Sequence, residues 1–214
     1  MEFFCASCRT PFLNDFALDA EGRCPLCRTG LRGFDAAYSY GFYEGALRDL
    51  IHLFKYKRIR TLARPLADLL NAAIPRDERF DAITAVPMHW LREWQRGFNQ
   101  SQLLAEAISS RTGIPAIRAL RRTRATPPQA GLSGTGRRRN LKAAFACRRP
   151  KTLAGKRILL IDDVMTTGST AAACAIELKR CGVERVALLT VARVDRRMDR
   201  PREMEQTLTL EGIS

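Results

Sequence analysis

The chain has 214 residues, 46% of them hydrophobic, and a formal net charge of +14 at pH 7. This is enough for one ordinary core with a small appendage. No run of about 18 apolar residues occurs and no secretory signal is visible, which excludes a membrane span by sequence. Seven cysteines, an odd number that includes two CxxC pairs, predict a reduced, cytoplasmic protein and not a disulfide framework.

The positive charge is concentrated in the middle of the chain. Residues 81–150 carry 13 basic and 3 acidic side chains, whereas the segments before and after each have a net charge of only +2. This asymmetry favours a polyanionic ligand or partner near the middle segment. The alternative is a solvated, arginine-rich surface that only aids solubility.

The first module is defined by four cysteines in two pairs. The pairs Cys5-x2-Cys8 and Cys24-x2-Cys27 are separated by fifteen residues. Each pair forms a tight turn that directs two thiolates at one point, and two such turns complete a tetrahedron around zinc. We therefore predict a zinc-ribbon module over residues 1–33, with a structural Zn²⁺ and no open coordination position.

The three remaining cysteines are not part of this pattern. We expect them to be buried, small apolar side chains: Cys147, Cys174 and Cys181.

From residue 34 onward, hydrophobic patterns typical of strands and helices alternate. In chain order we expect a strand or hairpin (36–44), two helices (46–57 and 62–73), a strand (80–87), a helix (99–113), two strands (117–120 and 157–162), a helix (170–182) and a last strand (184–193). This order predicts an α/β domain over residues 34–214, with a parallel sheet covered by helices on both faces. A basic loop rich in Pro and Gly, 121–140, is expected to be mobile until a ligand binds it.

The segment RILLIDDVMTTGST, residues 157–170, carries the strongest functional signal. An aliphatic strand ends in Asp162 and Asp163, and a loop of hydroxyl residues around Gly168 leads into a helix. Ligands bind beyond the carboxyl ends of parallel strands, and a helix N-terminus binds anions. The loop therefore suits a phosphomonoester and the carboxylates suit a diol, which together describe a ribose 5-phosphate.

Two other interpretations compete with this one. The strand with two acids is similar to a Walker B segment, but the chain contains no GxxxxGK[ST]. The other interpretation is that the hydroxyl cluster only caps a helix, although capping needs one such residue and not a run of four around a glycine.

The same segment resembles the signature with which type I phosphoribosyltransferases bind phosphoribosyl pyrophosphate (PRPP). Together with the double-CxxC module, AVPMHWLREWQRGFNQSQLLA (85–105) and QAGLSGTGRRRNLKAAF (129–145), it resembles the ComF family, also labelled GntX-like. The resemblance covers nearly the full length. It implies a type I phosphoribosyltransferase-like sheet and links the chain to DNA uptake during natural competence.

The resemblance also assigns roles to residues. As catalytic residues, Asp162 and Asp163 would hold the ribose hydroxyls, and the loop of Thr166, Thr167, Gly168, Ser169 and Thr170 would hold the 5′-phosphate. The segment after the strand at 80–87 would meet the diphosphate through Pro87, His89, Arg92, Arg96 and Gly97. Further basic candidates are Lys55 and Lys57 and, in the mobile loop, Arg137, Arg138 and Arg139.

The implied activity is phosphoribosyl transfer from PRPP, bound with Mg²⁺, to an acceptor that the sequence leaves open. Such a reaction needs no covalent nucleophile, because the protein positions the ribose phosphate and neutralises the leaving diphosphate. Two alternatives remain: a non-catalytic PRPP or nucleotide sensor, and a competence factor that binds single-stranded DNA or a helicase partner through its basic middle segment.

Overall fold

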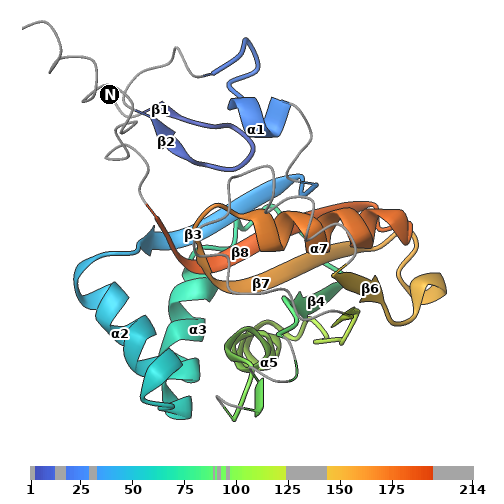
Figure 1. The fold of residues 1–214 in the computed structure, drawn as a ribbon. Coiled ribbons are helices and arrows are strands. Elements are labelled where there is room, and N and C mark those ends of the chain that lie inside the picture. Colours follow the sequence, from blue (N-terminus) through green and yellow to red (C-terminus); the bar gives the residue numbers. More distant parts are fainter. Residues whose placement is uncertain are drawn as a thin grey trace, which may run out of the picture.

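A parallel four-stranded sheet forms the centre of the molecule (Figure 1). The computed structural model describes residues 3–12, 18–28, 33–88, 90, 93–94, 97–123 and 144–194. The strands, in sheet order, are β3 (Ala36–Phe42), β8 (Arg185–Arg193), β7 (Arg157–Met165) and β4 (Ala82–Ala85). All three neighbouring pairs are parallel, which confirms the predicted α/β class.

Helices cover both faces of this sheet. Helix α7 (Ser169–Arg180) lies on one face, and α2 (Gly45–Tyr56), α3 (Ala63–Ala72) and α5 (Gln100–Thr112) lie on the other (Figure 1). Side chains alternate along β7, so Ile158 and Leu160 pack in the cluster with α7, whereas Leu159 and Ile161 pack with α3 and α5. Alternate residues of the aliphatic run thus face the two core clusters. This explains why the run has no polar position.

Several short elements complete the described structure. They are β1 (Phe3–Phe4), β2 (Pro11–Phe12), α1 (Pro25–Arg28), β5 (Leu120–Arg122), β6 (Phe145–Cys147) and two 3₁₀ turns, η2 (Arg60–Leu62) and η3 (Pro150–Thr152). Strands β1 and β2 form an antiparallel pair in the N-terminal module, and β5 and β6 form a second one beside α7.

Two strands differ most from the sequence prediction. Strand β7 continues to Met165, three residues past its predicted end, because β8 keeps pairing with it through Met165↔Arg193. The strand predicted over 117–120 begins later than expected: Ala116, just before that range, forms an isolated bridge to Ile83 of β4, and β5 begins only at Leu120. Of the predicted loop 121–140, the residues from 124 onward lie outside the described part of the chain.

The N-terminal module docks on the end of β8. The buried Arg193 guanidinium donates to the Cys8 carbonyl oxygen (2.9 Å) and to Thr10 Oγ1 (2.8 Å). The Ala37 N–H of β3 donates to the Ser7 carbonyl oxygen (3.1 Å). These bonds satisfy buried polar groups on both sides, so the module is held by specific contacts to two strands.

The prediction for the last three cysteines is right for one and wrong for two. Cys174 is fully buried in α7, but Cys147 and Cys181 are half-buried and joined by a disulfide. Strand β6 lies against the C-terminal end of α7, and this contact spans 34 residues of sequence, so the helical spacing of Cys174 and Cys181 gave no sign of it. Within the described ranges, no helix is long and apolar enough to cross a membrane.

Candidate functional site: a phosphate cradle beside two carboxylates

The loop after β7 is shaped by one glycine. Gly168 has φ +73°, in the left-handed region that side chains rarely adopt, and it directly precedes the first turn of α7. The Thr167 hydroxyl lies 2.8 Å from Ser169 Oγ and accepts the Ser169 N–H at 3.3 Å. The first-turn N–H groups that follow have no acceptor inside the helix, so they point at the space in front of it.

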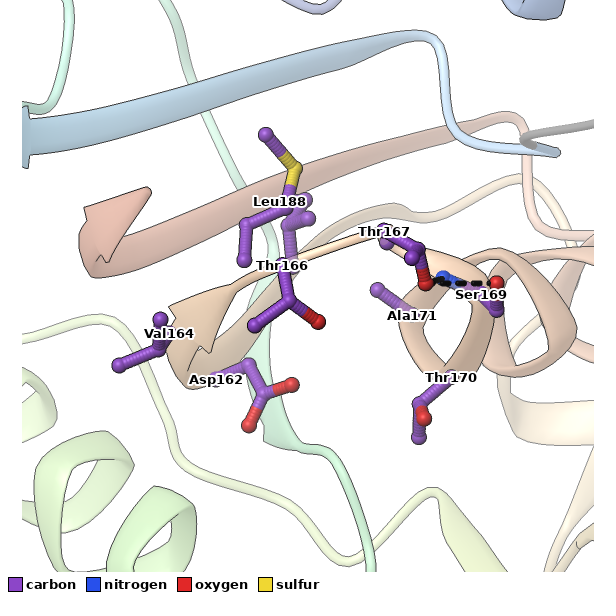
Figure 2. A pocket seen from close by; sticks show the side chains of 10 residues that line it. Asp162, Val164, Thr166, Thr167, Ser169, Thr170, Ala171 and Leu188 are labelled. Atoms are coloured by element: carbon purple, nitrogen blue, oxygen red, sulfur yellow. Dashed lines mark hydrogen bonds between the residues drawn. The ribbon is translucent and has the colours of Figure 1, made fainter. Parts of the chain in front are cut away.

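This space is a pocket of about 320 Å³ at the carboxyl end of β7. Its walls are Asp162, residues 164–171 and Leu188. Figure 2 shows the Asp162 carboxylate on the strand side, Thr167, Ser169 and Thr170 on the helix side, and Thr166 between them. One wall is therefore the N-terminus of α7, and the other carries the Asp162 carboxylate.

The two adjacent aspartates have different partners. Asp162 Oδ1 accepts hydrogen bonds from Ser101 Oγ (2.9 Å) and from the Asp163 N–H (3.0 Å). Burial, with repulsion from Asp163 as the second cause, raises the pKa of Asp162 to about 7. Near neutral pH this carboxyl group is thus divided between its acid and its carboxylate form.

Asp163 forms an ion pair with Lys55, the only basic residue in the last turn of α2. Lys55 Nζ lies 3.0 Å from Asp163 Oδ1, and both side chains are largely buried. Burial alone lowers the pKa of Lys55, but the charge of Asp163 outweighs it and the net shift is upward. Lys55, a further basic candidate of the sequence analysis for the anionic site, lies beside the two acids, and its partner in this structure is the Asp163 carboxylate.

The other predicted residues are only partly described. Pro87 follows β4 at the same edge of the sheet, where the Val86 N–H donates to the Ile161 carbonyl oxygen (2.9 Å). The Gly97 carbonyl accepts from Arg60 Nη2 at 2.5 Å, and Lys57 is exposed at the end of α2. The remaining candidates lie outside the described residues: His89, Arg92, Arg96 and Arg137, Arg138, Arg139.

Sequence reasoning missed Ser101 and Arg60. Ser101 is buried in the first turn of α5, which begins where Asn99 Oδ1 accepts the N–H groups of Ser101 and Gln102. A polar residue two positions after an Asn cap is only a weak sign of a site residue, because polar residues also stand at helix starts that face solvent. Arg60 reaches Gly97 and the Phe98 ring from 37 residues away, and nothing in the local pattern indicates this.

The four N-terminal cysteines converge on one point. Their sulfur atoms all lie within 4.8 Å of one another, and Cys8 Sγ is 3.8 Å from Cys24 Sγ. Four Zn–S bonds of about 2.3 Å in a tetrahedron place the sulfurs about 3.8 Å apart. The N–H groups of Cys8 and Cys24 donate to Cys5 Sγ (3.5 and 3.3 Å). Hydrogen bonds from the side chains of Cys24 and Cys27 lower the pKa of Cys5 to about 5. The cluster therefore fits a tetrahedral metal ion bound by thiolates.

The chain is similar in sequence to a family model and to named proteins. The family model described as "Phosphoribosyl transferase domain" matches residues 99–210. "Competence protein F" of Haemophilus influenzae is 35% identical over 178 residues, 79% of this chain and 78% of that protein. "DNA utilization protein YhgH" of Escherichia coli K12 is 38% identical over 158 residues, 71% of this chain and 69% of that protein. Adenine phosphoribosyltransferase from Thermoanaerobacter pseudethanolicus superposes with a TM-score of 0.41 at 15% identity, over 64% of this chain and 83% of that one.

The parallel sheet, the loop after β7 and the matched model define the class, a protein with a type I phosphoribosyltransferase-like domain. Within that class, the chain belongs to the ComF family.

Proposed function

We propose that the pocket binds PRPP together with Mg²⁺ and that the protein transfers the phosphoribosyl group to an acceptor. The observation that supports this is the pairing, in one pocket, of a Gly168-centred helix terminus with the Asp162 carboxylate. The helix terminus suits the 5′-phosphate, and the carboxylate suits the ribose hydroxyl groups. Asp163, the next residue, would accept a hydrogen bond from the second ribose hydroxyl group once Lys55 has moved away from it.

In this reaction pyrophosphate leaves C1 of the ribose with the bonding electron pair, and the acceptor forms the new bond to C1. Mg²⁺ would be bound mainly through PRPP itself and would neutralise the leaving diphosphate. Lys55 is the described cation nearest the acids, so its displacement from Asp163 would place a positive charge beside the ligand. The two relatives are named for competence and DNA utilization, and we propose that this chain serves the same process.

The test is calorimetric titration of PRPP–Mg²⁺ and, separately, inorganic phosphate. Asp162→Asn removes the charge that strengthens a hydrogen bond worth roughly 1.5–3 kcal/mol, so PRPP affinity should fall about 10- to 150-fold. Phosphate affinity should stay the same or rise slightly, because phosphate contacts only the loop. Asp49→Asn, an exposed acid of α2, is the matched control.

Two further measurements separate binding from turnover. Gly168→Val should weaken both ligands, because a β-branched residue is strained at φ +73° and its side chain occupies the phosphate space. Pyrophosphate release from PRPP, assayed with a panel of nucleobases and amines, tests for transfer. Unchanged PRPP affinity in folded Asp162→Asn would show that the ribose assignment is wrong.

For the cysteine cluster we propose structural zinc, one ion per chain. Four thiolates leave no open coordination position, so the ion would stabilise the module and take no part in catalysis. Elemental analysis of purified protein should give stoichiometric zinc. Cys24→Ser should lose the metal and unfold the module locally while the PRPP affinity of the remaining domain persists. Absence of zinc from protein prepared without chelators would contradict the assignment.

A further inference from the structure

The seven cysteines of this chain are of three kinds. Four converge in the N-terminal cluster, which fits a metal ion only while its thiols are free. Cys174 is fully buried in α7. Cys147 and Cys181 are half-buried and joined by a disulfide, which needs an oxidant to form. In a reducing compartment a disulfide is usually transient, with a catalytic or redox-sensing role. The Cys147–Cys181 pair is therefore the part of this chain whose oxidation state can change while the metal cluster stays intact.

The pair links strand β6 to helix α7. Cys147 is the last residue of β6, and Cys181 is the C-cap of α7, 34 residues further along the chain. Glu177, one helical turn before Cys181, has a carboxylate oxygen within 4.8 Å of both sulfur atoms. The fold thus holds the two sulfur atoms within bonding reach of each other and places a proton acceptor beside them.

The two cysteines differ in the charges around them. Cys147 lines a pocket of about 650 Å³, and four exposed arginines line it too: Arg118, Arg121, Arg148 and Arg149. All of the pocket's residues come from the segment 107–161, which contains no aspartate or glutamate. Cys181 instead lies at the C-terminal end of α7, where the helix dipole places partial negative charge. Positive charge favours a thiolate and negative charge favours the neutral thiol. Cys147 is thus placed as the nucleophile and Cys181 as the second thiol.

We propose that Cys147 and Cys181 form a reversible redox site whose co-substrate is an anionic low-molecular-weight disulfide. The Cys147 thiolate attacks one sulfur of that disulfide, whose S–S bond breaks and releases a thiolate with the bonding electron pair. The Cys181 thiol then loses its proton to the Glu177 carboxylate, and its sulfur attacks Cys147 Sγ and displaces the second thiolate. The two released thiolates take up the two protons of the protein thiols, so two thiols are oxidised and one disulfide is reduced.

The arginines beside Cys147 select the charge of the co-substrate. Guanidinium groups attract carboxylates and bind them through two parallel hydrogen bonds. A peptide disulfide with free carboxylates, such as oxidised glutathione, is drawn to Cys147, whereas a cationic disulfide is repelled. The bond that results joins β6 to α7 across 34 residues of sequence, so the oxidised protein should melt about 5–10 °C above the reduced protein. This inference stands whether or not the cradle binds PRPP.

The experiment oxidises the reduced full-length protein with two disulfides of opposite charge, anionic oxidised glutathione and cationic cystamine. Free thiols are counted over time by alkylation and mass spectrometry, and the metal content is measured alongside. Arg118→Gln with Arg149→Gln should lower the ratio of the glutathione rate to the cystamine rate about three- to tenfold, and high salt should do the same to the wild-type protein. The control pair, Arg48→Gln with Arg64→Gln, removes the same charge from exposed positions on α2 and α3 and should leave the ratio unchanged.

Single cysteine variants test the order of the two steps. Cys181→Ser should accumulate the mixed disulfide of Cys147 with glutathione, whereas Cys147→Ser should react at least about tenfold more slowly. Cys174→Ala, which removes the buried thiol of α7, should be oxidised like the wild-type protein. The proposal is overturned if the reduced protein keeps both thiols in oxidised glutathione, or if salt and the arginine variant leave the ratio of rates unchanged. It is also overturned if the reduced pair binds a second metal ion per chain together with Glu177.

Discussion

Glu78 and Asp162 are two half-buried carboxylates at opposite ends of the same sheet, and their surroundings shift their pKa values in opposite directions. Glu78 accepts the Tyr38 hydroxyl (2.6 Å) and two guanidinium bonds from Arg185. Burial raises its pKa, but these bonds and the Arg185 charge outweigh burial and lower it. At Asp162, burial and the charge of Asp163 act together and raise the pKa to about 7.

The difference separates a structural carboxylate from one available to a ligand. Glu78 ties β3, β8 and, through Arg157 at 3.8 Å, β7 at their amino ends. Its lone pairs are taken up by the protein's own donors. Asp162 has one side-chain donor, a carboxylate neighbour and an open pocket in front of it. A carboxylate held in an unfavourable environment beside a cavity is typical of functional sites.

The largest effect should come from Glu78→Ala. It leaves the Arg185 guanidinium and the Tyr38 hydroxyl without their partner at the amino ends of three strands. Breaking a half-buried pair in this way should lower the free energy of unfolding, measured by urea denaturation, by about 2–4 kcal/mol, less than for a fully buried pair. Asp77→Ala, at an exposed neighbouring acid, should change it by less than about 0.5 kcal/mol. If the two variants were equally stable, Glu78 would not be the structural anchor described above.

Asp163→Asn should have the next largest effect on stability. The substitution leaves the Lys55 ammonium, whose side chain is 16% exposed, without its ion-pair partner. We expect the free energy of unfolding to fall by about 1–3 kcal/mol, as for other buried groups left unsatisfied. The double variant Asp163→Asn/Lys55→Met should recover part of that loss, and no recovery would argue against the ion pair as the cause.

Asp162→Asn should raise the free energy of unfolding, by an amount that depends on pH. The pKa of Asp162 in the folded protein, about 7, lies above the ordinary carboxyl value of 3.8. Its contribution to stability is therefore fully present below about pH 4 and is lost as the pH rises through about 7. Asn does not titrate, so the variant should gain stability relative to the wild-type protein between about pH 4 and pH 8. A difference that stays constant over this range would mean that Asp162 is ionised throughout.

Much of the fold could be predicted because its signals are local. The apolar run of β7 and the Gly113 that ends α5 at φ +74° are fixed by nearby residues, and the predicted boundaries there agree to within a few residues. The end of β7 could not be predicted, since Asp162 and Asp163 look like the end of a strand and only pairing with β8 continues it. The Cys147–Cys181 bond likewise depends on how β6 lies against α7.

In the candidate site, too, the residues that are neighbours in sequence could be predicted together, and those that only the fold brings together could not. Residues 166–170 line one pocket around Gly168 because they are consecutive in one loop, so the motif alone places them together. The partners of the acids, Lys55 and Ser101, come from α2 and α5. The sequence gives Lys55 only as a further basic candidate for the anionic site, and it does not single out Ser101. Their roles follow from the way helices on one face of the sheet reach its carboxyl edge, which no local pattern records.

The smallest effect should come from Ser101→Ala, and it tests how the pKa of Asp162 is set. The Ser101 hydroxyl donates to Asp162 Oδ1 at 2.9 Å and lowers the pKa of that carboxyl group, which burial and Asp163 raise. Without this bond the pKa should rise further, so less of the carboxylate form is present near neutral pH. PRPP affinity should then fall about two- to tenfold, the equivalent of roughly 0.5–1.4 kcal/mol.

The pH profile distinguishes this positioning role from a merely structural one. If ribose binding needs the ionised Asp162, PRPP affinity rises with pH, and in Ser101→Ala the midpoint of that rise should move to higher pH. Ser101→Thr keeps the hydroxyl group and should restore the wild-type midpoint. A uniform loss of affinity at every pH would instead assign Ser101 to the packing of the α5 N-terminus, where its N–H already binds Asn99.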